Sequence, residues 1–203
     1  MQSIDGQTLA AWLETGQVLE KDGRGPKVVA LEDGHFLKIF HTRRAPWLAR
    51  LQPPAQGFAR NAADLKARCI AAPEIIECFW IDKAQGLSAC RYCPVPGCSL
   101  ETLMRTKPAT LPALLPHLAR FIRTLHRSGV YFRSLHLGNI MVEEGKNDAP
   151  FTFGLIDILD LKCTPRPLGA WKIRRNFKHL QHALERRKLA FPLAELRRLY
   201  DEI

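Results

Sequence analysis

Two side chains in the second half of the sequence have the chemistry of a magnesium site. Asn139 lies immediately before the apolar run at residues 140–142, and Asp157 follows the apolar run at residues 153–156. Short apolar runs separated by polar turn residues predict two strands joined by a hairpin, whose ends then lie side by side. An amide oxygen and a carboxylate at one point suit Mg²⁺, which takes one or two carboxylates together with substrate phosphates.

The spacing of these residues is typical of phosphoryl transfer. A kinase catalytic loop has the form H-R-D-L-x-x-x-N, and a metal-binding Asp follows on the next strand. In S-L-H-L-G-N at residues 134–139, Leu135 and Asn139 stand at the matching offsets. The segment resembles the D-L-H-x-G-N-I loop of small-molecule kinases such as aminoglycoside and choline kinases. G-L-I-D at residues 154–157 resembles their L-I-D metal motif.

The position of the catalytic Asp is occupied by Ser134. A serine hydroxyl is not a general base near neutral pH. Phosphoryl transfer relies mainly on positioning and charge stabilisation, so this change does not by itself abolish activity. His136, with an unperturbed pKa of about 6.5, is the preferred substitute base, and Asp160 is the other candidate. Arg133 is a candidate for stabilising the transferring phosphoryl group. The alternative is that His136 is a structural residue of the loop.

Residues 18–40 predict a three-stranded antiparallel sheet, with an Asp-Gly hairpin signal at residues 33–34. The first turn contains Gly23 and Gly25, which would let backbone N–H groups approach phosphates. The same pattern is typical of an ordinary turn. Lys38 lies on the third strand, where the kinase lysine contacts the α- and β-phosphates. The alternative is that Lys38 lies on the solvent face of an alternating strand.

The helix predicted at residues 55–69 contains no Glu. In protein kinases the corresponding helix supplies a Glu that pairs with the strand lysine. Asn61 and Asp64 are the nearest candidates for that role. This departure and the serine at position 134 both favour a protein without phosphotransfer activity.

Residues 91–100 resemble the hinge of small-molecule kinases, where adenine bonds to the backbone. The expected fold class is therefore α+β, a two-lobed protein-kinase-like fold with an antiparallel N-lobe sheet at residues 1–95 and a reduced helical C-lobe at residues 96–203. Residues 160–169 are expected to form a loop, and His126 is expected at the surface or as a helix cap. Strands are further expected at residues 78–81 and 87–95, and helices at residues 4–18, 55–69, 100–105, 111–128, 171–190 and 192–202.

The chain of 203 residues carries a formal net charge of +10. Such an excess favours a polyanionic partner, which charge alone does not identify. The helix at residues 171–190 is rich in Lys and Arg and is either a docking surface for a phosphorylated acceptor or anionic membrane, or a solvated face. Trp47, flanked by Arg43, Arg44 and Arg50, is a smaller basic–aromatic stretch with the same alternatives. Interleaved aromatics are lacking in the basic helix, which does not favour nucleic acid.

Apolar runs in the sequence are far shorter than a membrane span of about 20 residues. The N-terminus has neither a basic nor an apolar region typical of a signal peptide. We therefore expect a cytoplasmic protein that docks, if at all, peripherally on the inner membrane.

The chain contains six cysteines, of which Cys90, Cys93 and Cys98 are closely spaced. Close thiolates are typical zinc ligands, but no second C-x₂-C pair follows. Reduced structural thiols are the better interpretation for a cytosolic protein.

Together, the motifs resemble the lipopolysaccharide-kinase family of bacterial kinase-like proteins, which phosphorylate Kdo or heptose sugars of the lipopolysaccharide core. More narrowly, the sequence resembles Pseudomonas-type sequences called toluene tolerance proteins. The motifs are F-L-K-I-F at residues 36–40, Y-F-R-S-L-H-L-G-N-I at 131–140 and G-L-I-D at 154–157, and the likeness spans residues 18 to 185.

This resemblance implies ATP and Mg²⁺ as cofactors. Lys38 would hold the nucleotide phosphates, and Asn139 and Asp157 would hold the metal. The acceptor would be a sugar hydroxyl of a phosphorylated glycolipid, the lipopolysaccharide core, at the cytoplasmic face of the inner membrane. The alternative is a pseudokinase, a nucleotide-binding or scaffold module in envelope assembly with no phosphotransfer.

Overall fold

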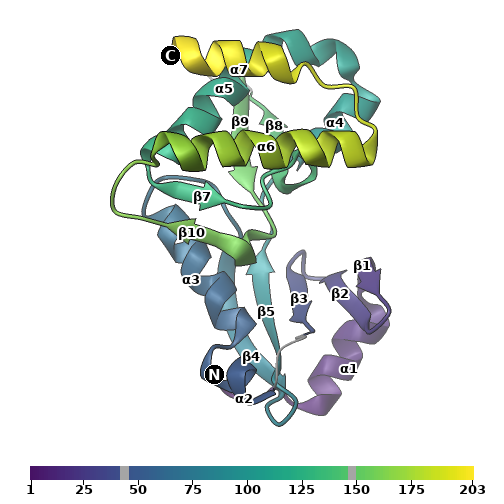
Figure 1. Cartoon of the computed structure of the whole chain (residues 1–203). Coiled ribbons are helices and arrows are strands. Elements are labelled where there is room, and N and C mark those ends of the chain that lie inside the picture. Colours follow the sequence, from purple (N-terminus) through teal and green to yellow (C-terminus); the bar gives the residue numbers. More distant parts are fainter. Residues whose placement is uncertain (42–45, 146–149) are drawn as a thin grey trace. The chain divides into compact units, whose positions relative to one another are not determined.

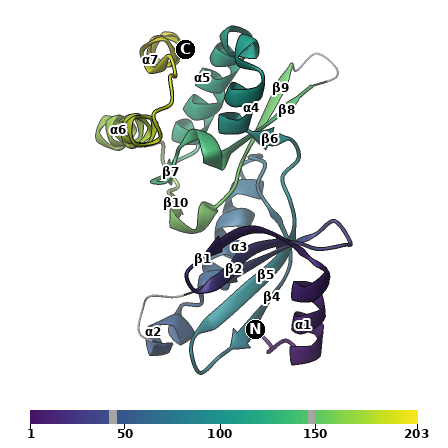
Figure 2. The same cartoon turned by 90° about the vertical axis from the view of Figure 1, so that its right-hand side faces the viewer.

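A computed structural model describes residues 1–41, 46–145 and 150–203. The chain divides into two compact units (Figures 1 and 2). The first consists of Met1–Ala63 and Pro73–Pro94, and the second of Asp64–Ala72 and Val95–Ile203. Arg43 and Arg44 of the predicted basic–aromatic stretch lie outside the described residues, while Trp47 and Arg50 lie on helix α2 (Pro46–Leu51).

A five-stranded sheet forms the first unit, in the order β1-β2-β3-β5-β4. All neighbouring strands pair antiparallel. The predicted three-stranded sheet is confirmed and is extended by the two later strands. The strands are β1 (Gln17–Asp22), β2 (Gly25–Ala30), β3 (Phe36–Phe40), β4 (Glu74–Asp82) and β5 (Leu87–Cys93).

Helix α1 (Gly6–Thr15) packs its apolar side against this sheet. The side chain of Asp5 accepts a hydrogen bond from the backbone N–H of Thr8 and so caps the helix. Trp12 and its apolar neighbours on α1 contact a buried cluster that includes Val29, Leu37 and Phe79. Burial of this apolar surface is the main term that holds α1 on the sheet.

Helix α3 (Pro54–Lys66) also has one buried side. Ala55, Phe58, Ala62 and Leu65 are at most 5% exposed. They recur at helical spacing, which explains why this segment forms an amphipathic helix. The ring of Phe58 lies 5.5 Å from that of Phe40.

The second unit combines helices with two small antiparallel sheets, β6-β8-β9 and β10-β7. Its core is centred on the apolar face of α5, where Leu114, Leu118, Ile122 and Leu125 are at most 1% exposed. The helices are α4 (Leu100–Thr106), α5 (Leu111–Arg127), α6 (Ala170–Arg187) and α7 (Leu193–Glu202), with short 3-10 turns η1 (Pro108–Thr110), η2 (Leu137–Asn139) and η3 (Ile158–Asp160). The strands are β6 (Cys98–Ser99), β7 (Val130–Phe132), β8 (Ile140–Glu144), β9 (Phe151–Leu155) and β10 (Leu161–Cys163).

The predicted loop at residues 160–169 is partly wrong, because residues 161–163 form β10. This strand pairs with β7, and Leu161 lies opposite Phe132. A three-residue strand has no detectable sequence period, so only its distant partner reveals it. Gly129 allows the two strands to approach: its φ is +72°, and a Cβ at this position would lie 2.2 Å from the carbonyl oxygen of Thr164.

Residues 64–72 are attached to the second unit by backbone and side-chain contacts. The backbone N–H of Leu155 donates to the carbonyl of Ala71 over 2.9 Å. The guanidinium of Arg68 donates to the carbonyl of Ser128 over 3.0 Å. Gly154 permits this close approach, since a Cβ there would lie 3.0 Å from the Ala71 oxygen.

Candidate nucleotide and metal site

The β8–β9 hairpin brings Asn139 and Asp157 to one end of two paired strands. Ile140 lies opposite Leu155 in the antiparallel register. The backbone N–H of Ile156 donates to the carbonyl of Asn139 over 3.0 Å, which continues the ladder beyond the strands. The predicted hairpin is thus confirmed, and its ladder ends directly before Asp157.

Asn139 is held in a fixed orientation. It is 7% exposed, and its side-chain Nδ2 donates to the carbonyl of Ser134 over 3.1 Å. Its backbone N–H donates to the carbonyl of His136 over 2.9 Å. Because the amide nitrogen is committed to this loop carbonyl, Oδ1 points away from it and is oriented as an acceptor or ligand.

Asp157 has an uncommon backbone conformation. Its φ of +52° and ψ of +43° place it in the left-handed region, which a residue other than glycine occupies at a cost of about 1–3 kcal/mol. Such residues persist where the surrounding structure fixes them, and they cluster at functional sites. Here the ladder bond at Ile156 precedes Asp157 and the 3-10 turn η3 follows it. The exposed carboxylate acts electrostatically on His136.

The donor set at this hairpin end suits Mg²⁺ bound together with phosphates. One carboxylate and one amide oxygen are too few to enclose a metal ion, but Mg²⁺ commonly takes its other ligands from water and substrate phosphate. Among the residues that the structure describes, no group of three or more His, Cys, Asp or Glu is placed to hold a metal ion.

Ser134 and Arg133 both contact Asp160. The Ser134 hydroxyl donates to Asp160 Oδ2 over 2.6 Å, and Arg133 Nε donates to the same oxygen over 3.3 Å. The other carboxylate oxygen, Oδ1, is buried and has no hydrogen-bond partner within the described part of the chain. A carboxylate therefore lies within one hydrogen bond of the serine that stands at the position of the catalytic Asp.

His136 is engaged in the local structure of the loop. Its Nδ1 accepts a hydrogen bond from the backbone N–H of Gly138 over 3.2 Å and caps η2. Burial and the nearby positive charge of Arg187 lower the pKa of His136, so the imidazole is neutral at pH 7. An Nδ1 that accepts a bond places the ring proton on Nε2. Nε2 already carries a proton, and the lone pair of Nδ1 is used in the bond from Gly138. Neither nitrogen is free to act as a general base, which favours the structural interpretation of His136.

The end of α6 reaches the same loop through an ion-paired cluster. Glu101 on α4 pairs with Arg187 of α6 and, over 3.2 Å, with Arg105. Burial opposes ionisation of Glu101, but the hydrogen bonds from these two arginines outweigh burial and hold its pKa below the usual value. A Cβ at Gly138 would lie 3.0 Å from the Arg187 guanidinium, so the loop and α6 are in close contact.

Lys38 lies in the first unit, on β3, opposite Val28 of β2 and Cys90 of β5. It is half-buried, and its Nζ lies 5.8 Å from the ring centroid of Phe58. A half-buried lysine beside an aromatic ring differs from the fully solvated lysine that an exposed strand face would give. Asn61 on α3, proposed in place of the missing Glu, is 8% exposed.

Gly23 and Gly25 lie at a tight turn between β1 and β2. Asp22 pairs with Gly25 in the strand register, and Asp22 Oδ1 accepts the backbone N–H of Arg24 over 2.8 Å. A Cβ at either glycine would meet nothing within 4 Å, so the space around the turn is open. Gly25, at a φ of +121°, is needed for the turn itself.

The prediction that His126 lies at the surface or caps the helix is wrong. His126 is 2% exposed, its Nδ1 lies 2.9 Å from the hydroxyl of Tyr200, and its Nε2 lies 3.2 Å from Asn176 Oδ1. Asn176 Nδ2 in turn donates to the carbonyl of Phe132 over 2.6 Å, directly before the segment with Arg133 and Ser134. The partners are 50 to 74 residues from His126, so no local pattern could have revealed this network.

The position of Cys90 is set by the pairing of strands β4 and β5. Cys90 lies opposite Cys78 in the β4–β5 register, with the two Sγ atoms 2.7 Å apart. Cys90 also contacts the carbonyl of Ala55 over 3.3 Å. Cys98 belongs to the second unit. These contacts account for the packing of Cys90.

The fold defines a class of protein: an antiparallel five-stranded unit followed by a helical unit with the β8–β9 hairpin is the protein-kinase-like fold. A sequence model of the Lipopolysaccharide kinase (Kdo/WaaP) family matches residues 98–201, and the chain belongs to this family. The predicted family and fold class are thereby confirmed. A search of curated protein sequences found no match.

Solved structures agree on the fold. WaaP in complex with acyl carrier protein aligns over 100% of this chain and 88% of its own, at 17% identity and a TM-score of 0.58. The Rio2 kinase–ADP/Mg²⁺–phosphoaspartate complex from Chaetomium thermophilum aligns over 97% of this chain and 64% of its own, at 18% identity and a TM-score of 0.57. Another Rio2 structure from that organism aligns over 95% and 66%, at 20% identity and a TM-score of 0.52.

Within the described residues, no helix is both long and apolar enough to cross a membrane.

Proposed function

We propose that this protein is an ATP-dependent kinase that transfers the γ-phosphoryl group to a sugar hydroxyl of the lipopolysaccharide core. The observation that carries the proposal is the β8–β9 hairpin end, where the fixed amide of Asn139 adjoins the left-handed Asp157. Membership in the lipopolysaccharide kinase family supports the acceptor class.

In this proposal the first unit is the nucleotide-binding N-lobe and the second is the C-lobe, with the division near residue 95. Lys38 holds the α- and β-phosphates, the turn at Gly23 and Gly25 covers them, and Asn139 and Asp157 hold Mg²⁺. Mg²⁺ held by these two residues would neutralise charge on the phosphates. The ADP/Mg²⁺ complex of the Rio2 structure supports this choice of nucleotide and metal.

Ser134 and Asp160 together replace the missing catalytic Asp. As the acceptor oxygen bonds to the γ-phosphorus, the bond from that phosphorus to the β,γ-bridging oxygen breaks and ADP leaves. Ser134 Oγ takes the acceptor proton and passes its own proton to Asp160 Oδ2, 2.6 Å away. The proton thus rests on a carboxylate and the serine is regenerated. Arg133, which donates to the same carboxylate oxygen, stabilises the charge that develops on the transferring phosphoryl group.

The acceptor is a polyanion in this proposal, and the exposed basic side of α6 is its docking surface. Arg174, Arg175 and Lys178 are exposed along this helix. The protein would act in the cytoplasm, peripherally at the inner membrane. Because WaaP was solved with an acyl carrier protein, an acyl carrier protein is also a candidate partner.

The test is calorimetric titration of the full chain with Mg²⁺–ATP. We expect Asp157→Ala to weaken binding by about 30-fold or more, because it removes the only carboxylate proposed to bind the metal. Glu143→Ala is the matched control, since Glu143 is an exposed carboxylate on β8 of the same hairpin. Absence of binding at millimolar ATP, or equal weakening in both variants, would contradict the nucleotide site.

A pseudokinase is the second candidate, favoured by Ser134 itself. In that case its hydroxyl, already bonded to Asp160, only stabilises the loop. Nucleotide binding without transfer to any core oligosaccharide, measured with γ-labelled ATP, would favour the pseudokinase. Labelled oligosaccharide in the wild type and none in Asp157→Ala would establish the kinase.

A further inference from the structure

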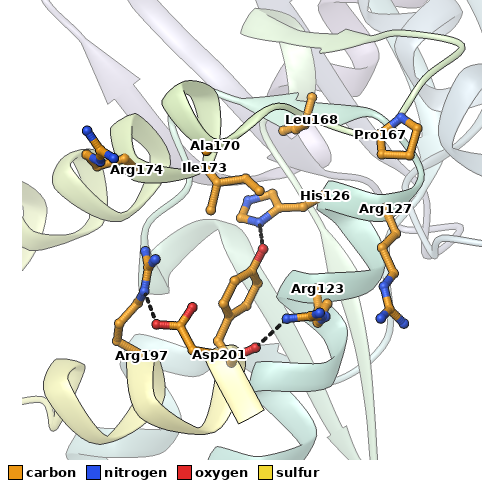
Figure 3. Close-up of a pocket in the computed structure, with 11 residues that line it drawn as sticks. Arg123, His126, Arg127, Pro167, Leu168, Ala170, Ile173, Arg174, Arg197 and Asp201 are labelled. Carbon is orange, nitrogen blue, oxygen red and sulfur yellow. Dashed lines mark hydrogen bonds and ion pairs between the residues drawn. The ribbon is translucent and has the colours of Figure 1, made fainter. Parts of the chain in front are cut away.

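A cavity of about 270 Å³ lies in the second unit, lined by the last turns of α5, the first turn of α6, α7 and the segment before α6 (Figure 3). It is separate from the residues assigned to the catalytic loop and metal motif. Its lining is partly apolar, with Leu168 and Ile173 on the α6 side. A water molecule takes about 30 Å³ in the liquid, so the cavity has room for a small ligand with several heavy atoms.

Four arginines surround this cavity, and Asp201 is the only carboxylate among the described residues that line it. Two of them, Arg127 and Arg174, are exposed and have no acidic partner in the part of the chain that the structure describes. Burial lowers the pKa of His126 to about 4, so its ring is neutral at pH 7 and the positive charge comes from the guanidinium groups. The lining therefore carries a surplus of positive charge that its own residues leave uncompensated.

The other two guanidinium groups are held in place by α7. Arg123 donates to the carbonyl of Tyr200 over 2.7 Å and lies 5.3 Å from its ring centroid. Arg197 pairs with Asp201 over 2.9 Å and lies 4.5 Å from the ring of Phe177. These contacts order the side chains before any ligand arrives, which reduces the entropy lost on binding.

We propose that this cavity binds a phosphomonoester. A planar guanidinium donates two parallel hydrogen bonds to phosphate oxygens, which makes arginine the preferred residue for this anion. The phosphate would lie among the arginines, and the carbon portion of the ester would contact Leu168 and Ile173. The first residue of α6, Ala170, is part of the lining, so the positive end of that helix adds to the attraction. This site does not depend on the nucleotide site proposed above.

The test is calorimetric titration of the full chain with glycerol 3-phosphate and with inorganic phosphate, in buffer without Mg²⁺ or nucleotide. We expect saturable binding at one site. The double substitution Arg127→Ala with Arg174→Ala should weaken it by about tenfold or more, because it removes charge-assisted hydrogen bonds. The matched control is Arg120→Ala with Lys162→Ala, which removes two exposed positive charges from α5 and β10 outside the cavity lining.

Absence of binding at millimolar phosphate in the wild type would overturn the proposal. Equal weakening in both double variants would also overturn it, since that result means diffuse attraction to the net charge of the chain. Vesicles of phosphatidylcholine with phosphatidic acid distinguish two sources of the phosphate. If the protein binds the vesicles and the Arg127 and Arg174 substitutions abolish this binding, the phosphate belongs to a lipid headgroup. If the protein binds glycerol 3-phosphate but not the vesicles, the phosphate belongs to a soluble ester.

Discussion

The buried imidazole of His126 should make the second unit sensitive to mild acid. In the folded protein burial lowers its pKa to about 4, whereas an unfolded chain has a histidine pKa of about 6.5. The unfolded state therefore binds the proton first, and the contribution of His126 to stability is complete above pH 6.5 and lost as the pH falls toward 4. Linkage over this pKa difference gives a loss of about 2 kcal/mol between pH 7.5 and pH 5.

The measurement is urea denaturation, followed by circular dichroism, of the wild type and of His126→Gln at both pH values. Glutamine does not titrate and keeps one donor and one acceptor for the hydroxyl of Tyr200 and the amide of Asn176. We expect the variant to be less stable at pH 7.5 but to lose about 2 kcal/mol less than the wild type on going to pH 5. Equal losses in the two proteins would refute the burial argument. Carboxylates and other histidines titrate in both proteins and cancel in the difference.

Three further predictions concern single positions. Asp160→Asn should lower the rate of phosphotransfer by about 100-fold, typical of a lost base, with Mg²⁺–ATP affinity unchanged by calorimetry; an unchanged rate would exclude the proton relay. Asn176→Ala should lower the free energy of unfolding by about 2–3 kcal/mol, because it breaks two buried hydrogen bonds; urea denaturation would show a change below 1 kcal/mol if these bonds are unimportant. Gly129→Ala should lower the melting temperature, because its Cβ would overlap the carbonyl of Thr164, whereas Gly6→Ala, with open space around it, should have little effect; similar shifts in both variants would contradict the steric argument.

Local patterns in the sequence were sufficient to predict most helices and strands. The helix predicted at residues 111–128 is α5 (Leu111–Arg127), and that predicted at 171–190 is α6 (Ala170–Arg187). Both have apolar residues at helical spacing along one face, a signal that needs no knowledge of the partner. The hairpin that places Asn139 next to Asp157 was equally local, since its two strands are neighbours in the chain.

The remaining features of the site depend on residues far apart in sequence. Ser134 and Asp160 are separated by 26 positions, and Glu101 and Arg187 by 86. A charged residue in a loop or on a helix face has many possible partners. The sequence alone does not indicate which residues of two distant segments contact each other. The burial of His126 was missed for the same reason, because its partners come from α6 and α7.

The nine residues from Asp64 to Ala72 have a consequence for how this protein can be divided or recombined. They belong to the second unit although the chain returns to the first unit immediately after them. A fragment that begins at Val95 lacks the carbonyl of Ala71 beside β9 and the guanidinium of Arg68 on the Ser128 carbonyl. A single crossover between two genes at this boundary would therefore separate contacts that have to be inherited together. Exchange of the helical unit between relatives requires two segments, and the β8–β9 hairpin that carries Asn139 and Asp157 is next to the shorter one.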